Sequence, residues 1–355
     1  MEPVKKKVLI FLQSGVGGAE RVSVTIGKNL DRNKFDVLFC LIGNETDDLS
    51  IEQFIPPYYN VIRLTGVNGF KALACYWNVL RNEKPEIVFS SIMHANTKLL
   101  ACSLLLKKTK FIVRNNNYLY TLSKLQLFLL KLFYRFADVI VAQTQEMALE
   151  LTDRLRLSKE KVFALQNPID KQNIDEKKDC PSPFERNSNP IYVACGRCHP
   201  VKGFDILIKA FAIVLQRQPN ARLHILGKIS SECDSFYHKI LNLVKDLQLS
   251  QNVFFDGFQA NPYVYIKNAS CFVLSSRNEG LPNVLIESLY LGTPVAATKC
   301  IPVIERIVRD GQDGFLAETE NVESLANAML KASSLGRVES CYQAAGLDEF
   351  QRLFE

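Results

Sequence analysis

The chain has 355 residues and a formal net charge of +6; 47% of its residues are hydrophobic and 23% are charged. This length predicts two domains that can each bury a core, and the composition excludes a disordered or fibrous protein. No uncharged apolar run is long enough to span a membrane as a helix, and the basic start followed by Val8–Leu12 is typical of a first strand rather than a signal peptide. Ten cysteines lie mostly singly in apolar runs, which favours reduced thiols in a cytoplasmic protein.

Basic charge is concentrated in one half of the chain. Residues 1–170 hold 23 Lys and Arg against 16 Asp and Glu, a net charge of +7, whereas residues 171–355 hold 20 against 21, a net charge of −1. The first half is therefore expected to meet an anionic partner, which nucleic acid, an anionic membrane or a phosphorylated lipid would satisfy. Nucleic acid is disfavoured because the aromatic residues lie in apolar runs and form no stacking platform.

Short β-rich runs alternate with helix-length segments, and this pattern restarts after residue 170. Such alternation predicts parallel sheets with helices on both faces. We therefore predict an α/β protein with two doubly wound, Rossmann-like domains, residues 1–170 and 171–338, joined by a Pro-, Asn- and charge-rich linker at about 168–190. The expected strands are Val8–Leu12, Val37–Ile42, Val61–Leu64, Ile87–Ser91, Phe111–Val113, Val139–Ala142, Ile191–Ala194, Leu223–Leu226, Val253–Phe255, Phe272–Leu274 and Val295–Ala297.

A glycine-rich segment with Gly15, Gly17 and Gly18 follows the first strand. Glycines let the backbone approach a ligand closely, and the N-terminus of the next helix offers N–H groups to an anion. A nicotinamide-binding pattern requires a further glycine where this chain has Glu20, so a dehydrogenase is excluded. An anion site and a tight strand-to-helix turn without a ligand both fit this segment.

A second candidate anion site is Gly196–Gly203, which follows the first strand of the second half. Arg197 and Lys202 flank a turn that opens a helix, so two cations and a helix dipole can converge on a diphosphate. Cys195 and Cys198 form a C-x-x-C pair, but a zinc site would need further ligands at matching spacing. The nearest candidate, His199, is adjacent to Cys198 and geometrically awkward, so we interpret the pair as a coincidence.

Two carboxylates mark the segment Ser275–Glu287. Glu279 lies in the loop after a strand, Pro282 suits the first turn of a helix, and Glu287 lies more than one turn into that helix. Carboxylates accept hydrogen bonds from sugar hydroxyls and a helix N-terminus attracts phosphate, so the segment predicts a polyhydroxylated, phosphorylated ligand. The residues between the carboxylates that are expected to border this ligand are Gly280, Leu281, Pro282, Asn283 and Val284.

From about residue 7 to 335, these motifs resemble those of the family-four retaining glycosyltransferases of bacterial surface-polysaccharide type, which have the GT-B fold. Gly15–Arg21 resembles the family's G-G-A-E-R opening, Asn167-Pro168 its N-P before the linker, and Asp310–Gly314 its late D-G-x-x-G turn. The resemblance implies that an acceptor-binding domain and a nucleotide-sugar-binding domain face each other across a deep cleft. It also implies that a last helix, within residues 339–355, crosses back to the first domain.

The resemblance also implies roles for single residues. Glu279 would contact the donor sugar and Glu287 the nucleotide ribose, while Arg197 and Lys202 would bind the leaving diphosphate. Gly257 and Phe258 would border the base, and Gly17 would lie near the diphosphate.

The implied chemistry retains the anomeric configuration without a protein nucleophile. The acceptor hydroxyl attacks from the leaving-group side, and a departing phosphate oxygen takes its proton. His94, just after Ile87–Ser91, matches a histidine that the family often places between donor and acceptor, and a general-base role and a structural role both fit it. Because the sequence has no Asp-x-Asp, we expect no metal and no prosthetic group, with a UDP-sugar as the favoured donor and a GDP-sugar as the alternative.

The segment Leu119–Ala137 is mostly apolar but carries a basic stripe. An interfacial helix on anionic headgroups and a largely buried helix with a basic solvent side both fit it. We expect reversible, salt-sensitive attachment to the inner face of the cell membrane, with Arg114 as a candidate contact for an acceptor phosphate. The cations expected at the membrane are Lys107, Lys108, Lys110, Lys124, Lys131 and Arg135.

The resulting hypothesis is transfer of a hexosyl or N-acetylhexosaminyl group from a nucleotide diphosphate sugar to a lipid-linked glycan, in surface polysaccharide, lipopolysaccharide or glycan assembly. Two alternatives are a transferase with a soluble small-molecule acceptor and a non-catalytic protein that binds a nucleotide sugar.

Overall fold

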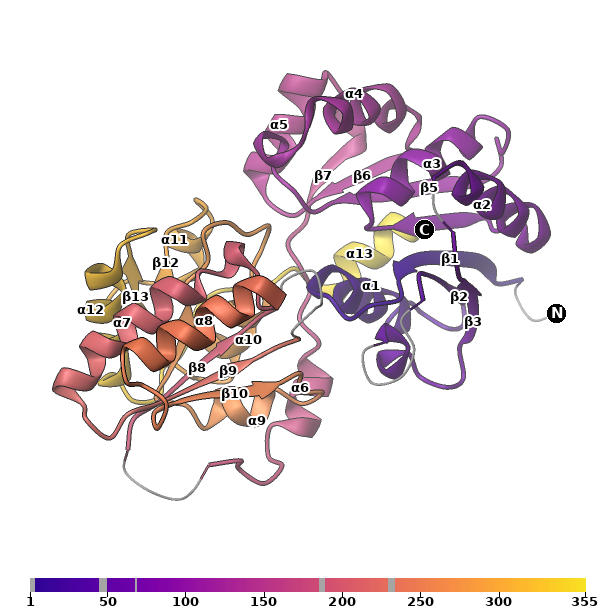
Figure 1. The fold of residues 1–355 in the computed structure, drawn as a ribbon. Coiled ribbons are helices and arrows are strands. Elements are labelled where there is room, and N and C mark those ends of the chain that lie inside the picture. The colour runs from indigo at the N-terminus through magenta and orange to yellow at the C-terminus, as the bar shows by residue number, and fades with distance from the viewer. Residues whose placement is uncertain (1–3, 45–49, 68, 185–188, 229–233) are drawn as a thin grey trace. The chain divides into compact units, whose positions relative to one another are not determined.

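The computed structural model describes residues 4–44, 50–67, 69–184, 189–228 and 234–355. The chain forms two compact units (Figure 1). Unit 1 contains the chain up to Ile169 together with Ala344–Glu355, and unit 2 contains Asp170–Gln343.

Unit 1 is built on a seven-stranded sheet with the order β3-β2-β1-β4-β5-β6-β7, in which all neighbouring strands are parallel. Because the strand order reverses between β1 and β4, the carboxyl ends of these two strands form the topological switch point where such sheets bind ligands. The strands are β1 (Lys6–Gln13), β2 (Phe35–Ile42), β3 (Asn60–Leu64), β4 (Ile87–Ser90), β5 (Lys110–Asn115), β6 (Val139–Ala142) and β7 (Val162–Ala164).

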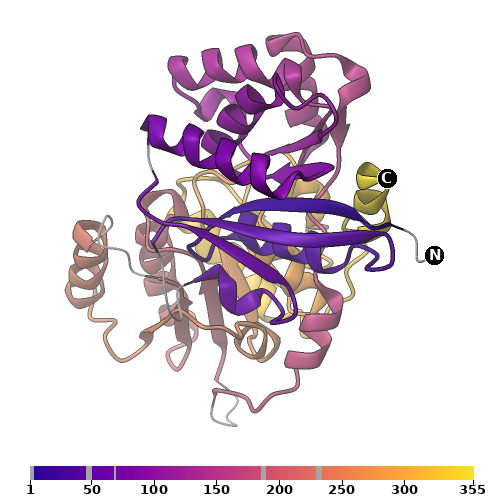
Figure 2. The ribbon, with the colours of Figure 1, turned by 90° about the vertical axis from the view of Figure 1, so that its right-hand side faces the viewer.

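Helices cover both faces of this sheet, and the C-terminal helix lies beside its strands (Figures 1 and 2). Phe350 and Phe354 of that helix share a hydrophobic core with Val8 of β1 and Ile26 of α1, so the end of the chain contributes to unit 1. The helices are α1 (Gly18–Lys28), α2 (Gly69–Glu83), α3 (Met93–Ser103), α4 (Lys124–Phe133), α5 (Gln145–Leu155) and α13 (Leu347–Phe354), with short 3-10 helices η2 (Ile51–Phe54), η3 (Leu119–Thr121), η4 (Tyr134–Phe136) and η5 (Lys159–Lys161).

The apolar segment 119–137 is not one continuous helix. The 3-10 helix η3 ends before Ser123, whose hydroxyl accepts a hydrogen bond from the Gln126 backbone N–H at 3.3 Å. The Gln126 side chain accepts in return from the Ser123 N–H at 2.8 Å, which completes a capping box. A single helix is therefore the wrong prediction here, because this cap starts a new helix, α4, at Lys124.

Unit 2 has a six-stranded sheet with the order β10-β9-β8-β11-β12-β13, again parallel throughout. Its order reverses between β8 and β11, which defines a second switch point. The strands are β8 (Ile191–Cys195), β9 (Arg222–Leu226), β10 (Val253–Gly257), β11 (Cys271–Leu274), β12 (Val295–Thr298) and β13 (Gly314–Ala317).

The helix expected after Gly203 is confirmed as α7, and its residues Phe204, Leu207, Phe211 and Val214 are buried in the unit 2 core. The stretch expected to be an aperiodic linker instead begins with a helix, α6, and its residues 185–188 lie outside the described ranges. The helices of unit 2 are α6 (Lys171–Lys177), η6 (Pro200–Lys202), α7 (Phe204–Arg217), α8 (Asp234–Asp246), α9 (Tyr263–Lys267), α10 (Asn283–Tyr290), α11 (Ile304–Ile307) and α12 (Val322–Ser333).

Candidate active site

The turn after β8 forms one wall of a polar site at the switch point of unit 2. Within the described ranges, no hydrogen bond or ion pair joins the exposed guanidinium of Arg197 to another residue. His199 Nδ1 accepts from the Val201 N–H at 3.2 Å and thereby shapes the short helix η6. Gly203, with φ +64°, ends η6 and caps α7. The turn therefore carries two cations, Arg197 and Lys202, just before the start of α7.

The loop after β11 meets this turn through an ion pair. Lys202 Nζ lies 2.6 Å from Glu279 Oε1, and both side chains are largely buried, with 23% and 12% of their surface exposed. The Ser276 hydroxyl donates to the same Glu279 oxygen at 2.6 Å. The structure thus brings together two predicted site residues that are far apart in the sequence, and it adds Ser276, for which no role was expected.

A thiol lies close to this ion pair. Burial raises the pKa of Cys300 to about 12, and the negative charge of Glu279 acts in the same direction. Cys300 is therefore a neutral thiol at neutral pH and cannot serve as a nucleophile there. Its position two residues after β12 gave no sequence signal.

The second carboxylate of the motif lies on α10. Glu287 is 7% exposed, and Leu281 and Pro282 before the helix are also buried. Pro282 is the N-cap residue rather than the first helical residue, and it offers no side-chain acceptor to the first-turn N–H groups. Gly280, Asn283 and Val284 are partly exposed around this helix start. The N-cap residue of α10 therefore makes no side-chain hydrogen bond to the first turn of the helix.

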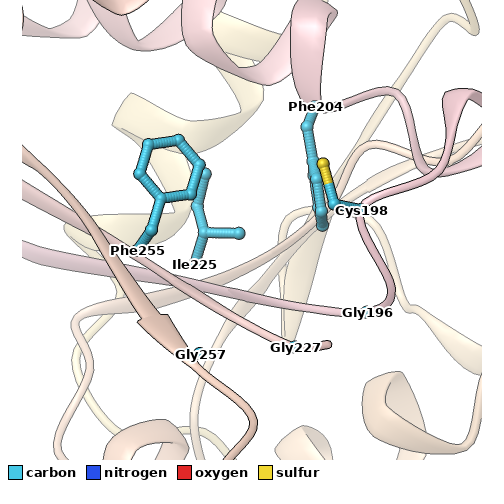
Figure 3. A pocket seen from close by; sticks show the side chains of 7 residues that line it. All are labelled: Gly196, Cys198, Phe204, Ile225, Gly227, Phe255 and Gly257. Atoms are coloured by element: carbon cyan, nitrogen blue, oxygen red, sulfur yellow. The ribbon is translucent and has the colours of Figure 1, made fainter. Parts of the chain in front are cut away.

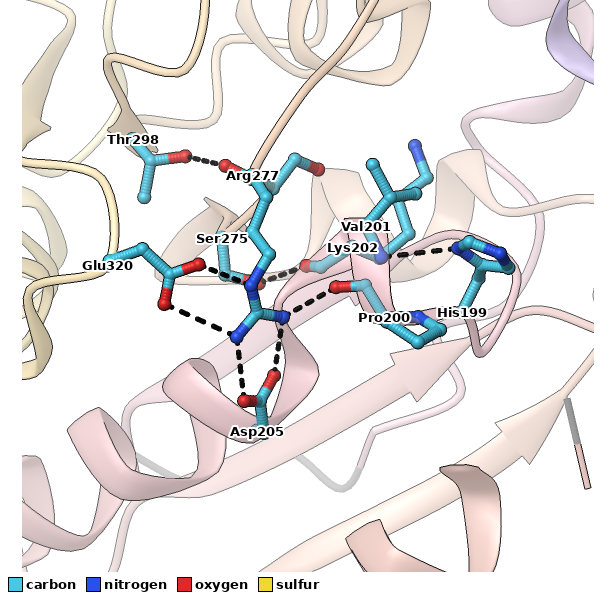
Figure 4. A network of polar contacts seen from close by, with 10 residues as sticks. His199, Pro200, Val201, Lys202, Asp205, Ser275, Arg277, Thr298 and Glu320 are labelled. Carbon is cyan, nitrogen blue, oxygen red and sulfur yellow. Dashed lines mark hydrogen bonds and ion pairs between the residues drawn. The ribbon is translucent and has the colours of Figure 1, made fainter. Parts of the chain in front are cut away.

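Arg277 links the loop after β11 to the turn after β8 (Figure 4). Its guanidinium forms a two-point ion pair with Asp205 on α7 and also contacts Glu320. Its backbone N–H donates to the Val201 carbonyl at 2.7 Å, and the neighbouring Ser275 hydroxyl donates to the Lys202 carbonyl at 2.8 Å. This network was not expected from the sequence, where its one signal is that Asp205 follows Lys202 closely.

A small hollow opens beside the same turn (Figure 3). Gly227, which lines the hollow, has φ +150°, and a Cβ there would lie 1.8 Å from the Gly196 carbonyl oxygen. No side chain therefore fits at position 227. Phe255 and the predicted base-binding residue Gly257 border the hollow, whereas Phe258, partly exposed, is not among its lining residues. Its lining residues are Gly196, Cys198, Phe204, Ile225, Gly227, Phe255 and Gly257.

The predicted residues of unit 1 lie around its own switch point. Gly17 is the N-cap of α1 and Gly18 its first residue, while Gly15 forms an isolated bridge with Ser50. His94, in the first turn of α3, lies with its Nε2 3.2 Å from the side-chain nitrogen of Gln13, at the end of β1. Surrounding protein atoms lower the pKa of His94, and the charge of Lys98 lowers it further, so the ring is neutral at pH 7.

Arg114 does not reach the surface of unit 1. The side chain is fully buried and donates to the Asn167 amide oxygen, and this burial lowers its pKa to about 9. Direct contact of Arg114 with an acceptor phosphate is therefore a wrong expectation, because its guanidinium is fully buried and donates a hydrogen bond to Asn167.

Among the described residues, His, Cys, Asp and Glu side chains form no group of three that could hold a metal ion. No described helix combines the length and apolar character that crossing a bilayer requires.

Two Rossmann-like units with a polar site at the switch point of the second define a protein of the GT-B fold class. The Glycosyltransferase Family 4 model matches residues 16–173, and the Glycosyl transferases group 1 model matches residues 175–345. The chain therefore belongs to the family-four glycosyltransferases, and the resemblance in its sequence motifs is confirmed.

Curated relatives and solved structures agree with this assignment. The chain is 28% identical to the Campylobacter jejuni N-acetylgalactosamine-N,N'-diacetylbacillosaminyl-diphospho-undecaprenol 4-alpha-N-acetylgalactosaminyltransferase, over 90% of this chain and 88% of the relative. An uncharacterised glycosyltransferase of Methanocaldococcus jannaschii is 34% identical over 62% of this chain, and the match spans 57% of that relative. The fold is similar to that of Anabaena HepE in complex with UDP and glucose, with a TM-score of 0.78, 20% identity and 98% coverage of both chains.

Proposed function

We propose that this glycosyltransferase moves a hexosyl or N-acetylhexosaminyl group from a nucleotide diphosphate sugar to a lipid-linked glycan, with retention of configuration and without a metal. The observation that carries the proposal is the contact between Lys202 and Glu279 at the carboxyl ends of β8 and β11. It joins a cation suited to a diphosphate and a carboxylate suited to sugar hydroxyls within one compact unit.

Each side chain then has a chemical task. Arg197 and Lys202 neutralise the charge that develops on the leaving diphosphate, as preorganised cations do in other transfer reactions. The diphosphate competes with Glu279 for Lys202, which frees the carboxylate to accept hydrogen bonds from the donor sugar. Glu287 binds the ribose, and Gly257 lies beside the base.

The reaction breaks the anomeric C–O bond to the diphosphate and forms a new bond from the same carbon to the acceptor oxygen. The acceptor hydroxyl proton passes to the departing phosphate oxygen. His94, neutral at pH 7, lies at the switch point of unit 1 and is the alternative proton acceptor.

A UDP-sugar is the favoured donor because the similar fold of Anabaena HepE has been solved with UDP and glucose. A lipid-linked acceptor is favoured because the Campylobacter relative is named for a diphospho-undecaprenol acceptor. We also propose peripheral attachment to an anionic membrane through the basic residues of unit 1. Those residues are Lys107, Lys108, Lys110, Lys124, Lys131 and Arg135.

Calorimetry with UDP- and GDP-sugars, each with chelator, tests the donor site. We expect one nucleotide class to bind with chelator present, and Arg197→Ala or Lys202→Ala to weaken binding by about tenfold or more. Lys209→Ala, which removes an exposed lysine from α7, is the matched control. Absence of binding to any nucleotide sugar, or an equal loss in the control, would contradict the proposal. NMR of the transferred product then shows whether the configuration at the anomeric carbon is retained.

A further inference from the structure

Apolar and basic side chains lie together on the outer face of α4 and η4 in unit 1. Leu125 and Phe128 are 66% and 62% exposed, and Leu132 and Phe136 are 39% and 37% exposed. Such large apolar side chains are seldom grouped on the surface of a water-soluble protein. The full set of exposed residues on this face, called the α4 face below, is Lys124, Leu125, Phe128, Lys131, Leu132, Arg135 and Phe136.

Helical spacing explains why these residues share one face. Lys124, Phe128, Lys131 and Leu132 follow one another at i, i+4, i+7 and i+8. The inner side is fixed by packing against α3, because Leu130 is buried and the buried Tyr134 hydroxyl accepts a hydrogen bond from Asn96 at 3.0 Å. The exposed apolar side chains therefore cannot rotate inward without breaking this packing.

The chain segment that carries the α4 face has charge of a single sign. From Ile87 to Ala137 the sequence contains eight Lys and Arg and no Asp or Glu. The next acidic residue, Asp138, accepts a hydrogen bond from the Phe111 backbone N–H at 2.7 Å and is thereby directed to the sheet. Cations beside exposed apolar groups match a surface that is both anionic and apolar below its charged layer, which describes a bilayer with anionic lipids.

We propose that the α4 face inserts Leu125, Phe128 and Leu132 into the interfacial layer of an anionic bilayer while Lys124 and Lys131 contact lipid phosphates. This inference deepens the proposed membrane attachment and rests on it, but it changes the expected binding mode. A purely electrostatic contact is lost in salt, whereas buried apolar area retains its contribution. Attachment should therefore have a part that salt does not remove.

Flotation with phosphatidylcholine vesicles, with and without phosphatidylglycerol, tests the inserted face. The full chain is compared at low salt and at about 1 M NaCl, where charges are screened within about 3 Å. We expect Leu125→Ser/Phe128→Ser to reduce partition into anionic vesicles by roughly 30-fold at both salt concentrations. Lys124→Gln/Lys131→Gln/Arg135→Gln should reduce it by about 100-fold at low salt and by much less at 1 M.

Leu149→Ser is the matched control, because Leu149 is 48% exposed on α5 of the same unit but outside the α4 face. Equal flotation of wild type and Leu125→Ser/Phe128→Ser would overturn the proposal, and so would an equal loss in the control. Sedimentation without lipid measures the oligomeric state and so tests a different occupant of the α4 face. If the protein is a dimer that only the α4-face variants disrupt, the face binds a second copy of the chain and the membrane proposal is wrong. Donor binding, measured on the same samples, does not depend on membrane binding. If the protein floats with vesicles but binds no nucleotide sugar, the proposed transferase function is contradicted and this inference is not.

Discussion

The guanidinium of Arg277 forms a two-point ion pair with the carboxylate of Asp205, with both N–O distances at 2.8 Å. This pair joins the loop that carries Glu279 to the helix that follows the Lys202 turn. We infer that Arg277 is a positioning residue: through Asp205 it sets the distance between Lys202 and Glu279, which are the proposed ligand contacts.

Arg277→Lys tests this role because it retains the charge and loses the two-point geometry. We expect kcat to fall by about tenfold or more, with a smaller change in donor KM, since misplacement of Glu279 mainly affects the transition state. Steady-state kinetics with thermal unfolding measures both effects. Lys299→Gln removes another ion-paired cation of unit 2 and should leave kcat unchanged. A fall in thermal stability with unchanged kcat would contradict the positioning role.

Acid should weaken the same pair. Burial alone would raise the pKa of Asp205, but the hydrogen bonds and charge of Arg277 outweigh it, so the folded-state pKa is lowered. A carboxylate whose folded pKa lies below its unfolded value of about 3.9 contributes stability above that pH and loses it as the pH falls through the folded value. Asp205→Asn should therefore destabilise unit 2 at pH 7 and progressively less below about pH 4. Urea unfolding at several pH values measures this, and a pH-independent difference would exclude the assignment.

Much of the fold could be predicted from local sequence, because most strands are apolar runs between helical patterns. The exceptions are short edge strands: β7 has three residues and β13 has four, and neither forms a strong apolar run. Periodicity identified the apolar and basic character of α4, but it could not show that Leu125 and Phe128 face outward, since that depends on which side packs on α3.

The candidate site could be predicted in part. Lys202 and Glu279 each follow a strand, and the switch point of a doubly wound sheet brings such loops together. Arg277 and Asp205 could not be paired from sequence, because their contact depends on how far each loop extends beyond β8 and β11. The Cys300 thiol near Glu279 is likewise a consequence of the order of β11 and β12 in the sheet.

Gly203 should be the least replaceable glycine of the Lys202 turn. Its φ is +64°, and a Cβ would lie 2.0 Å from the Ser275 carbonyl oxygen. Gly203→Ala must therefore displace one loop from the other, and we expect a loss of roughly 3 kcal/mol or more in unfolding free energy. Gly336→Ala is a matched control with φ +73° and no atom within 4 Å of the added Cβ, and it should cost only about 1 kcal/mol. Equal losses would show that backbone strain, not loop contact, makes Gly203 necessary.

The lowered pKa of His94 can be measured directly by NMR titration of its ring. Burial is the main cause and the charge of Lys98 the second, so Lys98→Gln should raise the pKa of His94 without restoring its ordinary value. The chain has only four histidines, and His94→Gln assigns the resonance. If His94 accepts the acceptor proton, kcat should fall as the pH drops through this pKa, and Lys98→Gln should move that fall to higher pH. An unchanged pH profile in Lys98→Gln would leave His94 with a structural role.

The C-terminal helix should stabilise unit 1 through Phe354. This side chain is fully buried, its ring centroid lies 5.6 Å from that of Phe89 on β4, and the adjacent Glu355 forms a 2.7 Å ion pair with Lys34. Phe354→Ala removes a core aromatic, so we expect it to lower the unfolding free energy of unit 1 by about 3–5 kcal/mol. Lys34→Gln breaks an exposed ion pair and should change stability far less. Hydrogen exchange resolved along the chain shows which segments lose protection. We expect faster exchange in β1, β2 and β4, because these strands share the core with Phe354. Faster exchange confined to α13 would instead show that the helix is docked without supporting the sheet.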